Sequence, residues 1–295
     1  MKRVVITGAT SMIGVALIEK CIENQVEVLA LVRSGSNKLK RIPESLYVTL
    51  RECNLNELAE FENYEGKYDV FYHLGWEHTD KKNRFEPQKQ IGNIQYAMDA
   101  VALAGRMGCK KFVGAGSQAE YGPVEGVINE ETPVNPQIAY GVAKYAAGRY
   151  CLTECAKYDL QYVWARIFSV YGPLDNEGTM IRYAVETMKK GESANFSSGE
   201  QMWDYLHSDD AGKAMYLLGD CVIEPGVYCV ASGDVRPLKT YIEQIQKVID
   251  PHGTVLFGEK KQNDIGIYPD ITKLATQTGF EASVDFEEGI KRLAK

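Results

Sequence analysis

The sequence predicts an α/β fold: a doubly wound parallel sheet with a small, partly interleaved C-terminal α/β lobe. Three observations carry this prediction. Short apolar, β-branched segments alternate with segments of helical period. A glycine-rich turn follows the first apolar segment. The chain of 295 residues is 45% hydrophobic, enough for a large core in one or two domains.

Six segments have the composition of buried strands, namely residues 4–7, 26–32, 47–53, 70–74, 111–115 and 162–168. The spacing of apolar residues predicts helices over residues 12–23, 88–107 and 140–158. Beyond about Tyr171 the alternation weakens, and we expect helices at residues 180–190, 238–249 and 286–293, with short strands at 204–207 and 227–231. Residues 1–172, joined by part of residues 203–232, then form the main domain, and residues 173–202 and 233–295 form the small lobe.

Charge and composition exclude several classes of function. The formal net charge is −7 and no run of Lys or Arg exceeds two residues, which argues against surfaces for nucleic acid or anionic membranes. The N-terminal apolar segment is too short for a signal peptide or a membrane span, so we expect a cytoplasmic protein. The seven cysteines form no CxxC pair and no ligand cluster, so we expect reduced thiols and no metal site.

The turn after the first strand reads GATSMIG, from Gly8 to Gly14. Glycines let the backbone approach a pyrophosphate, and the amides and dipole at the start of the next helix attract its charge. Ser11 stands where such turns usually carry glycine, a mild departure because serine is small. An ordinary strand-to-helix connection would explain the turn taken alone, but its place in the first βαβ unit favours a Rossmann-type dinucleotide site. The expected contacts are Gly8, Thr10, Ser11, Met12, Ile13 and Gly14.

The end of the second strand indicates which dinucleotide binds. Val32 stands where an acidic residue would hold the ribose 2′-hydroxyl of NAD, and Arg33 follows it, with Ser34 and Lys38 nearby. Because guanidinium pairs well with phosphate oxygens, we favour NADP over NAD, although Arg33 as a solvated loop residue is the plain alternative. Further expected cofactor contacts are Asn54, Leu55, Leu74, Gly75 and Asn93.

Tyr140 and Lys144 lie four apart in a predicted helix, so both project from one face. A lysine ammonium beside a phenol favours the phenolate, so we expect the pKa of Tyr140 to be lowered towards the range of an acid–base catalyst. Ser117 follows the strand at residues 111–115, at the edge where α/β sheets expose their ligand sites. This spacing of tyrosine and lysine is common by chance, and the three residues together are what predict catalysis.

The chain resembles the extended short-chain dehydrogenase/reductase family of nucleotide-sugar epimerases, dehydratases and reductases. The resemblance runs along nearly the whole chain, in TGATSMIG, HLG, GSQAEYG, EETPVNPQIAYGVAK, RIFSVYGP, GEQMWDYLHSDDAGKA and ITKLATQTGFEASVDFEEGI. It implies that Tyr140 is the acid–base residue, that Lys144 orients it and holds the nicotinamide ribose, and that Ser117 positions the reacting oxygen. Asn93 would support Lys144 through water. The family usually has asparagine at Ser169 and often arginine at Trp203, which puts the usual contact to the sugar diphosphate in doubt.

The resemblance also separates the possible reactions. Dehydratases of the family follow their serine or threonine with Asp-Glu, where this chain has Gln118 and Ala119, neither of which exchanges a proton at neutral pH. Dehydration is therefore disfavoured, and the apparent preference for NADP favours reduction of a 4-keto sugar nucleotide with Tyr140 as proton donor. The alternatives are an NAD-dependent nucleotide-sugar 4-epimerase and, outside enzymes, a catalytically inactive nucleotide-sensing protein.

The sugar site is the least defined by sequence. Trp76, Glu77 and His78 fall near the expected pocket mouth, although simple loop packing explains them equally well. The candidate substrate contacts are Trp76, Ser117, Gln118, Ser169, Arg182 and Trp203, with Asn195 and Lys260 added as diphosphate contacts by location alone. Related proteins often pair through the helices predicted at residues 88–107 and 140–158, so we expect a homodimer.

Overall fold

The computed structural model describes residues 1–62, 64–259 and 265–294. Its centre is a parallel sheet of seven strands in the order β11-β6-β5-β4-β1-β2-β3, which confirms the predicted fold class. The strands are β1 (Arg3–Thr7), β2 (Glu27–Val32), β3 (Val48–Glu52), β4 (Val70–His73), β5 (Lys111–Ser117), β6 (Gln161–Ile167) and β11 (Gly226–Val230). The strand order reverses between β1 and β4, and such sheets bind ligands outside the carboxyl ends of the strands at this point.

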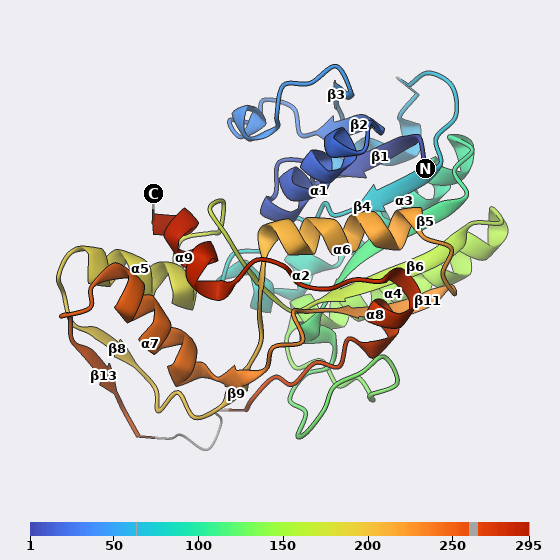
Figure 1. The fold of residues 1–295 in the computed structure, drawn as a ribbon. Coiled ribbons are helices and arrows are strands. Elements are labelled where there is room, and N and C mark those ends of the chain that lie inside the picture. The colour runs from blue at the N-terminus through green and yellow to red at the C-terminus, as the bar shows by residue number, and fades with distance from the viewer. Residues whose placement is uncertain (63, 260–264, 295) are drawn as a thin grey trace.

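Helices cover both faces of this sheet (Figure 1). On one face α1 (Met12–Glu23) packs beside α6 (Ser208–Asp220), and on the other α3 (Gly92–Arg106) packs beside α4 (Ala139–Lys157). Alternate strand residues point into the two cores, which is why the strands read as continuous apolar runs. The shorter connecting helices are η1 (Leu39–Arg41), η2 (Leu55–Glu60), η3 (Asn83–Phe85), α2 (Pro87–Gln90) and η4 (Gln118–Glu120).

A second group of helices has its own apolar core, at the left of Figure 1. It consists of α5 (Met180–Lys189), α7 (Leu238–Ile249) and α9 (Phe286–Ala294), with the parallel pair β8 (Ala194–Phe196) and β13 (Val255–Phe257). Aromatic rings fill its centre, where the rings of Tyr241 and Phe286 lie 4.7 Å apart. The remaining elements are β7 (Ser169–Tyr171), β9 (Met202–Trp203), β10 (Tyr205–His207), β12 (Arg236–Pro237) and α8 (Thr272–Thr278).

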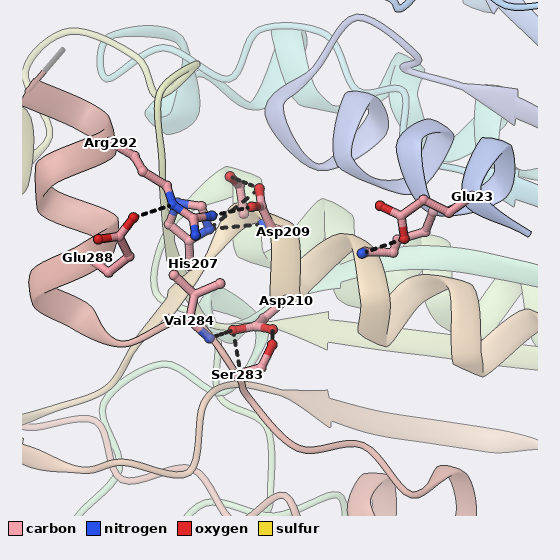
Figure 2. Close-up of polar contacts among 10 residues, drawn as sticks. Glu23, His207, Asp209, Asp210, Ser283, Val284, Glu288 and Arg292 are labelled. Atoms are coloured by element: carbon pink, nitrogen blue, oxygen red, sulfur yellow. Dashed lines mark hydrogen bonds and ion pairs between the residues drawn. The ribbon is translucent and has the colours of Figure 1, made fainter.

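Two charged residues join the C-terminal segment to the start of α6 (Figure 2). Asp210, 2% exposed, accepts hydrogen bonds from the amide and hydroxyl of Ser283 at 2.9 and 2.7 Å and from the amide of Val284 at 2.8 Å. Arg292 on α9 donates to Asp209 at 3.0 Å and to Glu288 at 3.1 Å. Hydrogen bonds to a buried carboxylate are strong, so this junction fixes α9 against the sheet domain.

Several elements differ from the sequence prediction. The helix predicted over residues 88–107 is two helices, α2 and α3, because the amide of Ile94 bonds back three residues to Ile91 and tightens the ladder there. Helix α6 was not predicted, although Asp209 and Asp210 in its first turn are typical of a helix start. Strands β7, β8 and β13 and helix α8 were also missed, because elements of three to seven residues show little periodicity.

Candidate active site

The turn between β1 and α1 requires its glycines. Gly8 has a φ of +68°, and a Cβ there would lie 2.6 Å from the amide nitrogen of Gly75. A Cβ on Gly14 would lie 2.4 Å from the carbonyl oxygen of Gly8. Ser11 caps α1 by accepting a hydrogen bond from the Gly14 amide at 3.0 Å, so serine fits the position where glycine is usual. A side chain at Gly8 or Gly14 would clash with the backbone, so this turn needs glycine at both positions.

A groove of about 550 Å³ runs along this turn and the carboxyl ends of β2 and β4. Nine of the predicted cofactor and substrate contacts line it: Gly8, Thr10, Ser11, Met12, Arg33, Leu55, Leu74, Gly75 and Trp76. Glu77 and His78, which were expected near the pocket mouth, line it as well. Lys38 and Arg41 join Arg33 in its lining, and Arg41 was not predicted. The close-packed glycines, the helix start and this group of three cations suit a dinucleotide with its phosphates.

The other predicted cofactor residues lie behind or beside the groove. Ile13 and Gly14 belong to the first turn of α1. Asn54 caps η2 and accepts a hydrogen bond from the Ser34 amide at 3.3 Å. Asn93, 1% exposed, accepts from the amide of Glu77 at 2.8 Å and donates to its carbonyl at 3.2 Å. Asn93 therefore holds a backbone segment, and its support of Lys144 through water stays a prediction.

The three predicted catalytic residues are brought together where β5 ends and α4 begins. Ser117 is the last residue of β5, one step earlier than expected, and hydrogen-bonds the side chain of Tyr140. Lys144, 3% exposed, donates from Nζ to the carbonyl of Ala115 at 2.7 Å. The same Nζ lies 3.7 Å from the centre of the Trp76 ring and 5.8 Å from that of Tyr140. These contacts place the trio against Trp76, which lines the groove, although none of the three residues is itself part of the groove lining.

The charges around Tyr140 differ from the sequence expectation. Burial raises the pKa of Tyr140, while the nearby Arg84 and the hydrogen bond from Ser117 oppose this rise. Burial also lowers the pKa of Lys144 to about 7, so near neutral pH the lysine carries only part of its charge. The expected lowering of the tyrosine pKa by Lys144 is thus wrong for the chain without ligand, because burial acts on both partners.

A buried glutamate holds Ser117 in place, and sequence reasoning missed it. Glu120, 0% exposed, accepts hydrogen bonds through Oε1 from the Ser117 amide at 2.8 Å and from Trp164 Nε1 at 3.0 Å. Its Oε2 accepts from Arg166 Nε at 2.8 Å. The spacing of Ser117 and Glu120 is that of a capping box, and the structure contains this motif at η4. That signal was available in the sequence.

A second missed residue lies in the arm, which we define as residues 76–86 between β4 and α2. The arm places Trp76 edge-on to Tyr140, with ring centres 6.0 Å apart. It also places the guanidinium carbon of Arg84 4.2 Å from the centre of the Tyr140 ring. A lone arginine in a polar stretch gives no sequence signal, so only the fold reveals this contact.

The predicted substrate residues are only partly assembled. Trp203 donates from Nε1 to the hydroxyl of Ser169 at 3.1 Å, so the two positions that depart from the family pattern contact each other. Gln118 lies in η4 with a buried Oε1 that has no partner among the described residues. Arg182 lies on α5, 3.7 Å from Glu186, and Asn195 lies on β8. Lys260 is outside the described residues.

No group of three His, Cys, Asp or Glu side chains in residues 1–62, 64–259 and 265–294 is arranged to hold a metal ion. None of the helices in these ranges is long and apolar enough to cross a membrane.

Comparison with known proteins identifies the family. Residues 4–231 match the model of the NAD dependent epimerase/dehydratase family. The chain is 25% identical to a putative UDP-glucose 4-epimerase of Methanocaldococcus jannaschii, covering 98% of this chain and 96% of that protein. It is 23% identical to the dTDP-4-dehydro-6-deoxyglucose reductase of Escherichia coli, covering 99% and 96%.

Solved structures share the fold. The UDP-N-acetylglucosamine 4-epimerase of Methanobrevibacter ruminantium M1 superposes with a TM-score of 0.87 at 24% identity, covering 99% of this chain and 97% of that one. RMD of Pseudomonas aeruginosa, complexed with NADPH, superposes with a TM-score of 0.83 at 18% identity, covering 100% and 98%. The fold, the glycine turn and the matched residues agree, and the chain belongs to the NAD-dependent epimerase/dehydratase family of NAD(P)-dependent enzymes that act on sugar nucleotides.

Proposed function

We propose that the chain is an NADPH-dependent reductase of a 4-keto sugar nucleotide, with Tyr140 as its proton donor. The observation that carries this proposal is the joining of Ser117, Tyr140 and Lys144 at the carboxyl edge of the sheet, with Gln118 and Ala119 in the positions where a dehydratase needs acids. Carbonyl reduction needs one proton donor and one hydride, whereas dehydration needs a further acid–base pair.

The preference for NADPH rests on three cations at one end of the groove. Arg33, Lys38 and Arg41 line it, and Val32 occupies the strand end where NAD-binding sites place an acid. A 2′-phosphate gains charge-assisted hydrogen bonds there that a hydroxyl does not. A nicotinamide bound in this groove supplies the hydride.

Calorimetric titration with NADPH and NADH tests this preference. We expect NADPH to bind more tightly, and Arg33→Ala to weaken NADPH binding about tenfold, the loss of one charge-assisted contact of about 1.4 kcal/mol, with little effect on NADH. Lys40→Ala is the matched control, because Lys40 is an exposed cation outside the groove lining, on the η1 helix that also carries Arg41. Equal affinities for NADPH and NADH would refute the assignment.

The chain's own residues supply the rest of the reaction. Ser117 and Tyr140 hydrogen-bond the keto oxygen of the sugar, which orients it and draws electron density from its carbon. As the carbonyl carbon gains hydride, the O–H bond of Tyr140 breaks and its proton passes to the oxygen, which becomes the product hydroxyl. The raised pKa of Tyr140 keeps the phenol protonated at neutral pH, as a proton donor requires. Lys144 holds the start of α4 to β5 through the Ala115 carbonyl.

Turnover tests the reaction. Purified protein with NADPH and a panel of 4-keto-6-deoxy sugar nucleotides is expected to consume the absorbance of the reduced nicotinamide. Tyr140→Phe keeps the ring and removes the proton donor, so it should lower kcat roughly 100- to 10,000-fold while NADPH affinity is kept. No consumption across the panel, or unaltered turnover by Tyr140→Phe, would refute the proposal.

An NAD-dependent 4-epimerase is the second candidate, favoured by the names of the Methanocaldococcus and Methanobrevibacter proteins. An epimerase retains its cofactor, so mass spectrometry of the purified protein distinguishes the two. Bound NAD, with interconversion of UDP-sugar epimers and no net oxidation of NADPH, would establish the epimerase. The intact Ser117, Tyr140 and Lys144 argue against a protein that only senses nucleotides.

We further propose a cytoplasmic homodimer that pairs through α3 and α4. Val142, Tyr150 and Leu152 on α4 are exposed apolar side chains, which are costly to leave in water on a monomer. Light scattering after size exclusion is expected to give the mass of a dimer, and Tyr150→Glu should shift it towards the monomer. A monomeric wild-type chain would contradict the proposal.

A further inference from the structure

Arg84 is the cation that lies nearest to the Tyr140 ring. Its guanidinium carbon is 4.2 Å from the ring centre, whereas Lys144 Nζ is 5.8 Å away. A cation over an aromatic face is attracted to it, and the attraction grows when the ring carries negative charge. The residue expected to control Tyr140 is therefore not the only positive charge beside it.

Two buried amide side chains hold the arm that carries Arg84. Gln90, 1% exposed, donates from Nε2 to the carbonyls of His78 at 2.8 Å and Asn83 at 3.0 Å, and accepts from Trp76 Nε1 at 2.9 Å. Asn93, equally buried, bonds both backbone groups of Glu77. Both ends of the arm are thus fixed to α2 and α3, and the place of Arg84 over Tyr140 is built into the fold.

The charge of Arg84 is left free to act on Tyr140. None of the ion pairs found among the described residues includes Arg84. The Nε atom of Arg84 is buried and has no hydrogen-bond partner among the residues that the structure describes. Arg84 is half-buried, and a guanidinium that has no carboxylate partner acts electrostatically on the groups that it contacts, here Tyr140.

We propose that Arg84 is a second cation of the proton-transfer site, which stabilises the negative charge that develops on Tyr140 as its proton leaves. This role rests on the proposed function, in which the Tyr140 O–H bond breaks and the proton moves to the substrate oxygen. With Arg84, the proposed site has four residues in place of three, and Arg84 acts on the reaction through Tyr140.

The charges that face Tyr140 come from three neighbouring elements. They are Arg84 on η3, Lys144 on α4 and Glu120 on η4. Burial and Lys144 lower the pKa of the nearby His73 to about 3, so that ring is neutral. Among these groups Arg84 lowers the pKa of Tyr140 most, whereas Glu120 raises it. Lys144 holds only part of its charge near neutral pH, which leaves Arg84 as the permanent cation.

Fluorine NMR of difluorotyrosine-labelled protein tests the role without any turnover. The fluorinated phenol is more acidic, which brings its titration into the range where the protein stays folded, and Tyr140→Phe identifies the resonance. We expect Arg84→Gln to raise the titration midpoint by roughly one to three pH units relative to the wild-type chain, the effect of one opposite charge at this distance. Arg84→Lys should keep most of the wild-type value. Lys82→Gln, which removes an exposed cation of the same arm, should leave it unchanged.

The enzymatic arm uses the same variants and any nucleotide-sugar substrate that the chain turns over. Arg84→Gln should lower kcat with KM nearly constant and move the pH dependence upward, and Arg84→Lys should restore both. An Arg84→Gln midpoint equal to that of the wild type overturns the proposal, as does a rise in KM alone, which would make Arg84 a substrate anchor. Because the NMR midpoint needs no substrate, an inactive chain with a shifted midpoint would refute the proposed reaction and leave the charge assignment standing.

Discussion

Replacing Glu120 by glutamine tests how Ser117, the proposed catalytic serine, is held. The carboxylate is 0% exposed and accepts three hydrogen bonds, from the amide of Ser117, the indole of Trp164 and the guanidinium of Arg166. Glutamine has the same shape but one acceptor atom. If its oxygen stays with Ser117 and Trp164, its amide group faces the Arg166 Nε and two donors oppose each other.

The magnitude follows from the ion pair with Arg166. The two side chains lie 2.8 Å apart with 6% and 1% of their surfaces exposed, so Glu120→Gln leaves a buried guanidinium without its countercharge. Breaking one side of a buried pair costs about 3–5 kcal/mol, a large part of the roughly 5–15 kcal/mol by which domains are stable. Urea unfolding followed by tryptophan fluorescence measures this loss, with Trp164 as a probe at the site itself.

Two further variants isolate the cause. Glu131→Gln removes an exposed carboxylate eleven positions later in the chain and should change the free energy of unfolding by less than about 0.5 kcal/mol. Adding Arg166→Met to Glu120→Gln removes the unpaired charge and should recover part of the lost stability. If Glu120→Gln unfolds at the same urea concentration as Glu131→Gln, the buried pair does not hold this part of the site.

Three other changes test separate parts of the structure. Gly8→Ala forces a Cβ to within 2.6 Å of the Gly75 amide at a φ of +68°, so we expect a loss of about 1–2 kcal/mol in stability and weaker NADPH binding, measured by urea unfolding and calorimetry. Asp210→Ala leaves the donors of Ser283 and Val284 unpaired and should cost about 3 kcal/mol or more, with faster amide hydrogen exchange in α9. The pKa of Lys144 is about 7 in the folded chain, below the ordinary lysine value of 10.5 that applies on unfolding, so the unfolded state binds more protons between these values and stability rises with pH there. Relative to Lys144→Met, the wild type should gain at most about 1.4 kcal/mol per pH unit between pH 7 and 9, and parallel curves would contradict the lowered pKa.

The sheet domain was predictable because its signals are local. Apolar β-branched segments marked the six strands β1 to β6, and the glycine turn located the start of α1. Helix α6 was missed because its buried residues include Gly212 and Gly219, which weaken the helical pattern in the sequence. A Cβ on Gly212 would lie 2.5 Å from the backbone of Ala16, so these positions follow from the packing of α6 on α1. That packing cannot be read from one segment alone.

The candidate active site likewise combines residues with a local sequence signal and residues that only long-range packing brings together. Tyr140 and Lys144 share one helix, so their spacing predicts that they project together, and Ser117 follows from its place at the end of a strand. Arg84 reaches Tyr140 from a segment 56 positions earlier in the chain, brought there by the hydrogen bonds of Gln90. Contacts that depend on such long-range closure leave no periodic signal in the sequence.

The contact between Ser169 and Trp203 changes how the departures from the family pattern should be weighed. Counted by sequence, serine in place of asparagine and tryptophan in place of arginine are two separate losses from a sugar-diphosphate contact. In the structure the indole of Trp203 donates to the Ser169 hydroxyl at 3.1 Å, so the two residues form one polar unit. The departures therefore count as one coupled replacement in the proposed sugar site, separate from the proposed proton-transfer residues Ser117, Tyr140 and Lys144, which match the family pattern.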